Sequence, residues 1–400
     1  MPRPKTEGVS LSFAFLSLAG ALASAGCSAA PDAPGDPLEE AGQSAEALET
    51  AASPHAVGFD LVKAQNLIHG IAGDDRFVFV TEPLTGRVTV HSRVTGRQIA
   101  ELPPPPGGFL LPFTLRVPER GRLVVLDPGG FPNPAAGVIA RVYDYDYDFD
   151  ARTRSFRATL ARTVRFDGLP VGFSEDVEVL DDGSYVLTDS VIGAIWLIEP
   201  DGAIRPGLLP SSFEFGQGLP FLEPCILGTV TVDGIPLDLG GGYAPGAGSV
   251  AASGGYVYWG GFCHGGIHRI SLSTLRDSSR SAEERAQEIE VVTESAPGSP
   301  QLFKGLTFNR FDPNDRRLYA TDCFHGGLVR IDVETGQSQT LISDSVLFDF
   351  PVSAHFLPPL GLQTLMIASD QEHRFDALNA AIDHDMFRPP FRAAEVLLFD

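Results

Sequence analysis

The feature that most constrains this chain is an apolar run ending in an acidic residue or a glycine, which recurs six times. We call the last residue of each run the marker. The six markers are Glu82, Asp127, Asp189, Gly261, Asp322 and Asp370. A second apolar run precedes each marker and a third follows most of them, with Gly, Pro, Asp and Asn between the runs. Short apolar runs separated by such residues are typical of β-strands joined by turns.

Three to four strands repeated six times predict an all-β fold, a six-bladed β-propeller, because stacked blades bury the hydrophobic faces that a single blade leaves exposed. The last strand, near Glu395–Phe399, would share a blade with an N-terminal strand near Val57–Val62 and so close the ring. A pair of β-sandwiches is the alternative fold, but it does not explain six markers in one frame. Residues 274–290 favour the one clear helix, because Ser281 and Glu284 are spaced as a capping box.

The N-terminus has the composition of an export signal. Arg3 and Lys5 form a short basic region, residues 8–26 carry no charge, and small residues lead to Cys27. This pattern resembles a bacterial lipoprotein signal, in which the cysteine is lipidated and becomes the mature N-terminus. Plain signal cleavage and a retained membrane anchor remain open, since 19 uncharged residues could just span a bilayer.

The predicted organisation is a lipoprotein-type signal peptide over residues 1–26, a flexible tether over 27–56 and the propeller over 57–400. The tether is rich in Ala, Pro, Ser and Glu, a composition typical of flexible linkers. We therefore expect an exported protein, either a lipoprotein of the cell envelope or a secreted protein. It would touch the membrane only through its lipid anchor.

The net charge narrows the choice of partners. The chain has 51 acidic and 29 basic side chains, which gives a formal net charge of −22. Nucleic-acid binding depends on cationic neutralisation of phosphates, so this balance excludes a nucleic-acid partner. The same charge favours a soluble monomer.

Candidate ligand-binding residues are expected at one rim of the propeller. The innermost strand of each blade starts at this rim, and the turn after the marker lies on it too. The residues at strand starts are His69, Glu175, Asp176, Lys304 and His355, and those in the turns are His264 and His325. Carboxylates, an amine and imidazoles there could position or protonate a small polar ligand. The alternative is that each satisfies loop backbone groups, the role we also expect for the marker acids.

The cysteines leave their pairing open. Besides Cys27 the chain has Cys225, Cys263 and Cys323, of which an exported protein can pair two. The spacing of these cysteines and the nearby histidines does not match that of a zinc site.

Several stretches, in their order along the chain, resemble the major royal jelly/Yellow protein family. They are Leu123–Asp127, Val177–Leu197, Arg269–Asp277 and Ser369–Pro390. The resemblance covers most of residues 57–392 and implies a propeller. Members of that family include dopachrome-converting enzymes and small-amine binders. It therefore implies a small-molecule ligand at the axial rim, with no cofactor.

A second resemblance is to the gluconolactonase/regucalcin propellers, since the run Phe324–Leu328 is similar to part of one of their blades. In that family a divalent cation is held by carboxylate and Asn oxygens at the starts of inner strands. The matching positions here are His69, Glu175, Gly248 and Lys304. Only Glu175 supplies an oxygen ligand, which makes it a weak metal candidate, and Lys304 would repel a cation.

Three functions follow from these patterns. The leading interpretation is an exported, lipid-anchored propeller of the royal jelly/Yellow type that binds a small molecule at its axial rim. The alternative is a lactonase or esterase-like hydrolase that uses Ca²⁺ or another divalent cation. The third is a non-catalytic surface scaffold that binds another protein. Catalysis itself is left open, as either lactone hydrolysis or dopachrome conversion.

Overall fold

The computed structural model describes residues 55–130, 139–150, 152–153, 155–209, 230–238, 247–261, 266–294 and 301–399. All of these lie in the second of two compact units, Thr50–Asp400. The residues 1–26, with Cys27, and most of the tether lie outside the described residues. Within the described ranges, no helix is long and apolar enough to span a bilayer.

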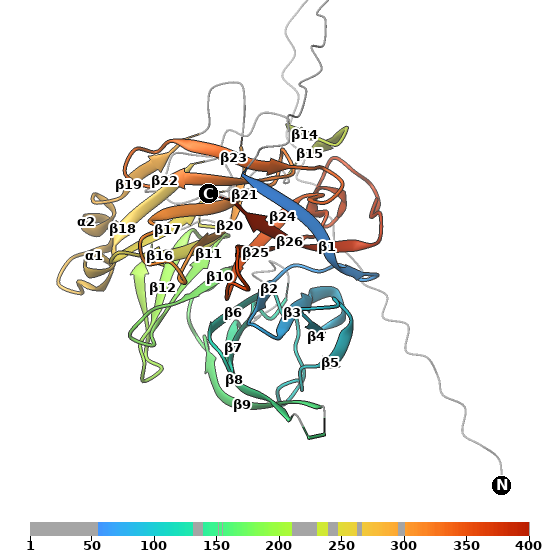
Figure 1. Cartoon of the computed structure of the whole chain (residues 1–400). Coiled ribbons are helices and arrows are strands. Elements are labelled where there is room, and N and C mark those ends of the chain that lie inside the picture. The colour runs from blue at the N-terminus through green and yellow to red at the C-terminus, as the bar shows by residue number, and fades with distance from the viewer. Residues whose placement is uncertain are drawn as a thin grey trace, which may run out of the picture. The chain divides into compact units, whose positions relative to one another are not determined.

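Six four-stranded antiparallel sheets form the blades (Figure 1). Blade 1 consists of β2 (Ile71–Gly73), β3 (Phe77–Glu82), β4 (Arg87–Ser92) and β5 (Gln98–Glu101). Blade 2 consists of β6 (Thr114–Glu119), β7 (Arg122–Asp127), β8 (Arg141–Asp150) and β9 (Ser155–Arg165). Blade 3 consists of β10 (Ser174–Val179), β11 (Tyr185–Asp189), β12 (Ala194–Ile198) and β13 (Ile204–Leu208). Blade 4 consists of β16 (Val250–Ser253), β17 (Tyr256–Gly260), β18 (Ile267–Ser271) and β19 (Glu290–Thr293). Blade 5 consists of β20 (Phe303–Phe308), β21 (Arg317–Asp322), β22 (Gly327–Asp332) and β23 (Ser338–Ser343). Blade 6 consists of β24 (Pro351–Leu357), β25 (Gln363–Ser369), β26 (Phe391–Leu398) and β1 (Ala56–Ala64).

The predicted six-bladed β-propeller is therefore confirmed. The inner strands β2, β6, β10, β16, β20 and β24 contact one another in ring order, with β24 beside β2. Hydrophobic side chains fill the spaces between neighbouring blades. Phe79 of blade 1, for example, packs edge-on against Tyr147 of blade 2, with ring centroids 4.9 Å apart. Such contacts bury the faces that a lone blade would expose.

Two of the marker acids have the structural role expected of them. Asp189 accepts hydrogen bonds from the backbone N–H groups of Gly172 and Phe173 and from those of Val191 and Ile192 in the following turn. Asp127 likewise accepts from Leu110, Leu111 and Gly129. A carboxylate that joins two chain segments in this way explains why an acid recurs at this position in several blades.

The remaining elements lie between strands or at turns. They are α1 (Leu272–Arg276), α2 (Ala282–Ala286), the hairpin of β14 (Val230–Val232) and β15 (Ile235–Leu237), and the short 3-10 helices η1 (Pro83–Thr85) and η2 (Glu372–Arg374). The predicted capping box is present, with Ser281 and Glu284 bonded to each other's backbone N–H. The single predicted helix over 274–290 is instead two short ones.

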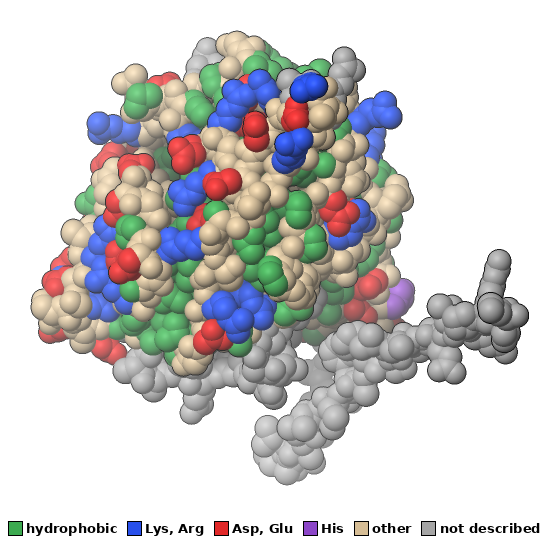
Figure 2. All heavy atoms as spheres, turned by 90° about the horizontal axis from the view of Figure 1, so that it is seen from below, with side chains coloured by type: hydrophobic (Ala, Val, Ile, Leu, Met, Phe, Trp, Pro, Cys, Tyr) green, Lys and Arg blue, Asp and Glu red, His purple; other side chains and the backbone are tan. Residues whose placement is uncertain are grey.

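The surface in Figure 2 shows basic and acidic side chains interspersed, with hydrophobic side chains between them. No single sign of charge gathers on this face. The ion pairs at exposed positions, such as that of Arg165 with Asp167 at 2.8 Å, are consistent with this mixture.

Blade 6 is closed by the two ends of the chain, as the sequence predicts. Strand β1 pairs antiparallel with β26, from Ala56 opposite Leu398 to Ala64 opposite Phe391. Val62 is 2% exposed and packs into the core of this blade. The N-terminal strand thus fastens a ring that would otherwise end in an unpaired edge.

Truncation tests this closure. Removing residues 1–64 deletes β1, exposes the edge of β26 and should lower Tm by roughly 5 °C or more, since each kcal/mol lost shifts Tm by a few degrees. Removing residues 1–54 keeps β1 and serves as the control, with Tm unchanged. Differential scanning calorimetry of both proteins would contradict the closure if their transitions coincided.

Candidate functional site

Five titratable side chains converge at the propeller axis, at the end where the inner strands begin. We call His69, Glu175, Lys304, Asp370 and Glu372 the axial cluster. They come from four blades: His69 precedes β2, Glu175 lies in β10, Lys304 in β20, and the last two follow β25. Each is at most 6% exposed. Groups with such buried charges are unusual outside functional sites or ion-pair networks.

An ammonium group lies at the centre of the cluster. Nζ of Lys304 is 2.6 Å from Oε2 of Glu372 and 3.4 Å from Oε1 of Glu175. Burial alone would lower the pKa of Lys304, but the charges of Glu372 and Glu175 outweigh it and hold the pKa above its usual value. The amine therefore stays protonated, and two carboxylates share one positive charge.

A histidine and a carboxyl group form a pair beside this ammonium. Nδ1 of His69 is 2.9 Å from Oδ2 of Asp370, and the imidazole stacks on Phe113 with ring centroids 3.6 Å apart. Burial, aided by the charge of Lys304, lowers the pKa of His69 to about 4. Burial raises the pKa of Asp370 to about 7, although Lys304 opposes the rise. Near neutral pH the ring is thus neutral and the carboxyl group changes its charge.

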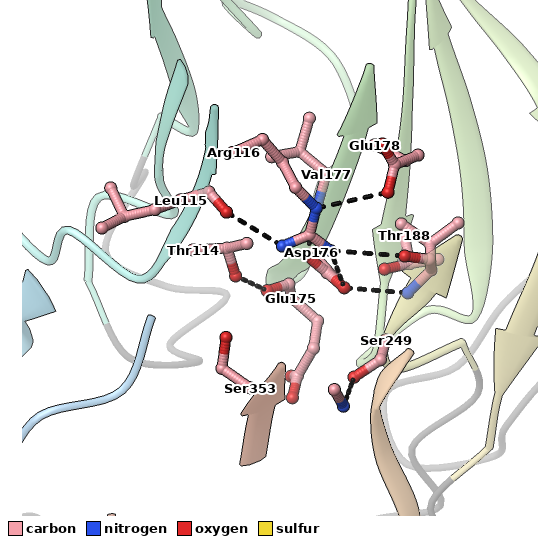
Figure 3. A network of polar contacts seen from close by, with 12 residues as sticks. Thr114, Leu115, Arg116, Glu175, Asp176, Val177, Glu178, Thr188, Ser249 and Ser353 are labelled. Carbon is pink, nitrogen blue, oxygen red and sulfur yellow. Dashed lines mark hydrogen bonds and ion pairs between the residues drawn. The ribbon is translucent and has the colours of Figure 1, made fainter. Parts of the chain in front are cut away.

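Asp176, also predicted as a ligand residue, is held in a network of its own (Figure 3). Nη2 of Arg116 donates to both of its carboxylate oxygens at 2.9 Å, and the N–H of Val250 donates to Oδ2 at 2.9 Å. Arg116 also bonds Glu178 and the Leu115 carbonyl. This network joins β6, β10 and β16, so the carboxylate of Asp176 has a structural role and does not belong to the axial cluster.

The predicted histidines do not all reach the axial cluster. His355 was expected at a strand start, but β24 begins at Pro351, so His355 lies four residues further along, towards the opposite end of the axis. His325 is about half exposed and bonds Asp322 at 2.9 Å, which raises its pKa. His264 lies outside the described residues.

Of the three cysteines after Cys27, Cys225 and Cys263 lie outside the described residues. Cys323 is buried, is a free thiol within the described part of the chain, and donates to the Pro351 carbonyl at 2.9 Å. Burial raises the pKa of this thiol well above its usual value, which makes it a poor nucleophile.

Two members of the axial cluster escape the sequence prediction. Asp370 is a marker, and its expected structural role is present, since Oδ1 accepts a hydrogen bond from the backbone N–H of Glu372 at 2.9 Å; the contact of its Oδ2 with His69 was not predicted. Glu372 follows it in the turn. After β25 the chain bends through Gln371, whose φ is 59°, and enters η2. This bend brings Glu372 to the ammonium of Lys304. The only signal in the sequence was the missing downstream glycine and the charged run that replaces it.

The axial cluster does not fit a divalent cation. Of the positions that match the metal ligands of lactonase propellers, only Glu175 supplies an oxygen, and the ammonium of Lys304 lies 3.4 Å from it. A cation held by Glu175 and Glu372 would have to lie beside this fixed positive charge. In the described ranges, no group of three or more His, Cys, Asp or Glu side chains could hold a metal ion. We therefore derive no metal chemistry at this position.

The substitution Lys304→Met tests the charge balance of the cluster. It leaves Glu175 and Glu372 buried without their partner, which should lower the free energy of unfolding at pH 8 by about 3–5 kcal/mol. A second substitution, Glu372→Gln, should restore part of the stability, because it removes one of the two carboxylates left without a partner. Urea unfolding at pH 8 measures both effects.

A matched control is Lys63→Met, which removes a lysine whose side chain is 57% exposed and paired with Asp60. Exposed ion pairs contribute little, so its effect should stay below about 1 kcal/mol. An equally small effect of Lys304→Met would contradict the proposed charge balance.

Comparison with known proteins establishes the fold. No protein-family model and no curated protein matches the chain. A luciferin-regenerating enzyme has a TM-score of 0.52 and 9% identity, covering 86% of this chain and 95% of its own. A putative oxidoreductase (glucose dehydrogenase) from Thermus thermophilus has a TM-score of 0.51 and 15% identity, and the match covers 86% of this chain and 100% of its own. A gluconolactonase from Xanthomonas campestris has a TM-score of 0.49 and 15% identity, and the match covers 87% of this chain and 92% of its own.

The structures similar to this chain include propellers of the gluconolactonase and regucalcin type. The comparisons give no support to the royal jelly/Yellow resemblance. At identities of 15% or less, the likeness extends to the six-bladed propeller and not to an activity.

Proposed function

We propose that this protein is a small-molecule hydrolase that opens a lactone or ester at the axial cluster, with the ammonium of Lys304 in place of a divalent cation. The observation that carries the proposal is the buried His69–Asp370 pair beside a charged amine. Buried titratable groups with shifted pKa values are typical of catalytic sites. The structural comparisons support the fold on which the proposal rests, and the chemistry rests on the cluster.

The histidine is the general base in this reaction. When Nδ1–H of His69 donates a hydrogen bond to Oδ2 of Asp370, Nε2 carries the lone pair of the neutral ring. Nε2 takes a proton from a water molecule as the water oxygen bonds to the carbonyl carbon. The ionised carboxylate of Asp370 stabilises the imidazolium that forms and keeps the ring in the required tautomer.

The amine stabilises the charge that develops on the substrate. As water adds, the carbonyl oxygen becomes an oxyanion, and a fixed ammonium in a buried position lowers the energy of that state. The tetrahedral intermediate then breaks its bond to the alkoxide oxygen, and the imidazolium returns the proton to that oxygen. The product is a hydroxy acid. Glu175 and Glu372 hold the amine in place throughout.

A second candidate function is small-molecule binding without turnover, as the royal jelly/Yellow resemblance implies. The observation that favours it is the surplus of negative charge at the axis, where two glutamates and Asp370 face one lysine. A protonated amine would balance this surplus. An amine that raises Tm in a protein without lactone turnover would place this function ahead of hydrolysis.

Asp370→Asn separates the catalytic role from a structural one. The amide would donate to Nδ1 of His69, leaving the proton on Nε2, so that hydrolysis of a lactone probe should fall by about 10³–10⁴-fold. The same change should raise Tm at pH 8. Burial lifts the pKa of Asp370 from 3.8 to about 7, so the folded state binds more protons than the unfolded state between these values and loses stability as pH rises through them.

The control for this variant is Asp146→Asn, at an exposed carboxylate in β8 of blade 2. It should leave both turnover and Tm unchanged. Unaltered hydrolysis in Asp370→Asn would contradict the role of the pair.

The pH and chelator dependence of hydrolysis gives a further prediction. Turnover should rise as pH passes through about 7, because Asp370 must be ionised to stabilise the imidazolium. EDTA should leave the rate unchanged, since the fixed cation is an amine. Loss of activity in EDTA, restored by Ca²⁺, would instead support the metal-dependent hydrolase.

Export and lipid anchoring are part of the proposal and rest on the sequence alone. Lipidation of Cys27 would hold the propeller at a membrane through its tether. Cys27→Ala should move the protein from the membrane fraction to the soluble fraction of cells that express the full chain. Equal membrane association of both forms would argue against the lipid.

A further inference from the structure

A cavity of about 330 Å³ lies at the opposite end of the propeller axis, where the inner strands finish. Its lining includes Arg116, Arg122, Glu178, Arg310 and His355, and no member of the axial cluster. The Arg116–Asp176 network lies on the inner strands between the two ends (Figure 3). The cavity is therefore a separate place from the site of the proposed hydrolysis.

Among the described residues, the guanidinium N–H groups of one arginine in this cavity, Arg310, are available to bind a ligand. Arg116 is engaged by Asp176, and Arg122 by Asp144 at 3.1 Å. The guanidinium of Arg310 lies over the Phe311 ring at 4.8 Å and has neither an ion pair nor a hydrogen bond in the described part of the chain. A guanidinium with free, coplanar donors binds carboxylates in a bidentate manner.

A buried histidine adds an acceptor. His355 is 5% exposed, and its Nε2 has no hydrogen-bond partner among the described residues. Burial and the charges of Arg310 and Arg116 hold its pKa well below the usual value, so the ring is neutral. One nitrogen of a neutral imidazole carries a lone pair, and in the tautomer with the proton on Nδ1 that nitrogen is Nε2. An acceptor buried without a donor is destabilising, and a ligand hydroxyl would supply that donor.

Besides Glu178, which pairs with Arg116, two further carboxylates line the cavity. Glu119 and Asp181 are exposed and line the same cavity. They disfavour a simple anion, but each can accept a hydrogen bond from a hydroxyl group. The described lining thus offers the guanidinium of Arg310 and several acceptors.

We propose that this cavity binds a small polyhydroxy carboxylate. The carboxylate pairs with the guanidinium of Arg310, one hydroxyl donates to Nε2 of His355, and others donate to Glu119 and Asp181. A cavity of this volume holds a sugar-sized molecule. The proposal is independent of the hydrolysis at the axial cluster.

Three six-carbon probes separate the features that this ligand needs. D-gluconate has a carboxylate and hydroxyls, sorbitol has only hydroxyls and hexanoate has only a carboxylate. By isothermal titration calorimetry of the full-length protein, gluconate should bind saturably with one site, and the other two should bind at least about tenfold more weakly. The absence of saturable gluconate binding would overturn the proposal.

Variants then locate the binding. Arg310→Gln should weaken gluconate binding by about tenfold or more, because it removes the guanidinium that pairs with the carboxylate. Arg120→Gln is the matched control, since Arg120 is an exposed arginine in the turn after β6 that pairs with Asp75 and does not line the cavity. An equal effect of both variants would show nonspecific attraction and refute the site.

The histidine has its own test. His355→Phe removes an unsatisfied nitrogen and should leave the protein folded, while the preference for gluconate over hexanoate should largely disappear. Asp370→Asn, in the axial cluster, should leave gluconate affinity unchanged. A loss of gluconate affinity in Asp370→Asn would place the ligand at the axial cluster and overturn its assignment to this cavity. That conclusion holds whether or not the protein hydrolyses lactones.

Discussion

The ion pair between Arg116 and Asp176 is the interaction on which the centre of this propeller depends. Six inner strands meet at the axis, and each brings polar groups that water cannot reach. The guanidinium of Arg116 satisfies several of these groups at once, because it donates hydrogen bonds to Asp176, to Glu178 and to two backbone carbonyls from different strands. Because both partners are nearly fully buried, neither could be removed alone without leaving an uncompensated charge. The pair thereby fixes three blades and divides the axis into two chemically different ends.

At the end where the inner strands begin, burial sets the chemistry. One ammonium and three carboxyl groups share a space that excludes most water, so their charges are strongly coupled, and Asp370 holds its proton up to a pH near 7. Such an arrangement destabilises the folded state as the carboxyl group ionises. Burial raises the pKa of Asp176 and Asp189 as well, but their oxygens are held by Arg116 or by backbone N–H groups. Asp370 differs because its Oδ2 lies 2.9 Å from the imidazole of His69, a group that can exchange a proton with it.

The sequence predicts the fold and three of the five residues of the axial cluster. The marker repeat defines six blades, and the strand starts bring together His69, Glu175 and Lys304. Asp370 could not be identified, because it accepts from a backbone N–H group just as Asp189 does in the repeat, and only its second oxygen contacts His69. The structural role of Asp176 could not be predicted either, since its partner Arg116 lies 60 residues earlier in the chain and only the closed ring of blades brings the two side chains into contact. The position of His355 was wrong because the strand begins at Pro351, before the apolar run from which its start was predicted.

The lysine at the axis and the His69–Asp370 pair explain one another. A divalent cation in this place would supply two charges and could lower the pKa of a bound water, so that little further help would be needed to form the nucleophile. An ammonium supplies one charge and has no open coordination position, and it can stabilise an oxyanion without activating water. In the proposed hydrolysis, a site with Lys304 in this position would need a separate base, and the neutral histidine beside it, oriented by a carboxylate, has the protonation state that a base requires. The proposal thus links the lysine in the place of a metal ligand to the presence of the His69–Asp370 pair.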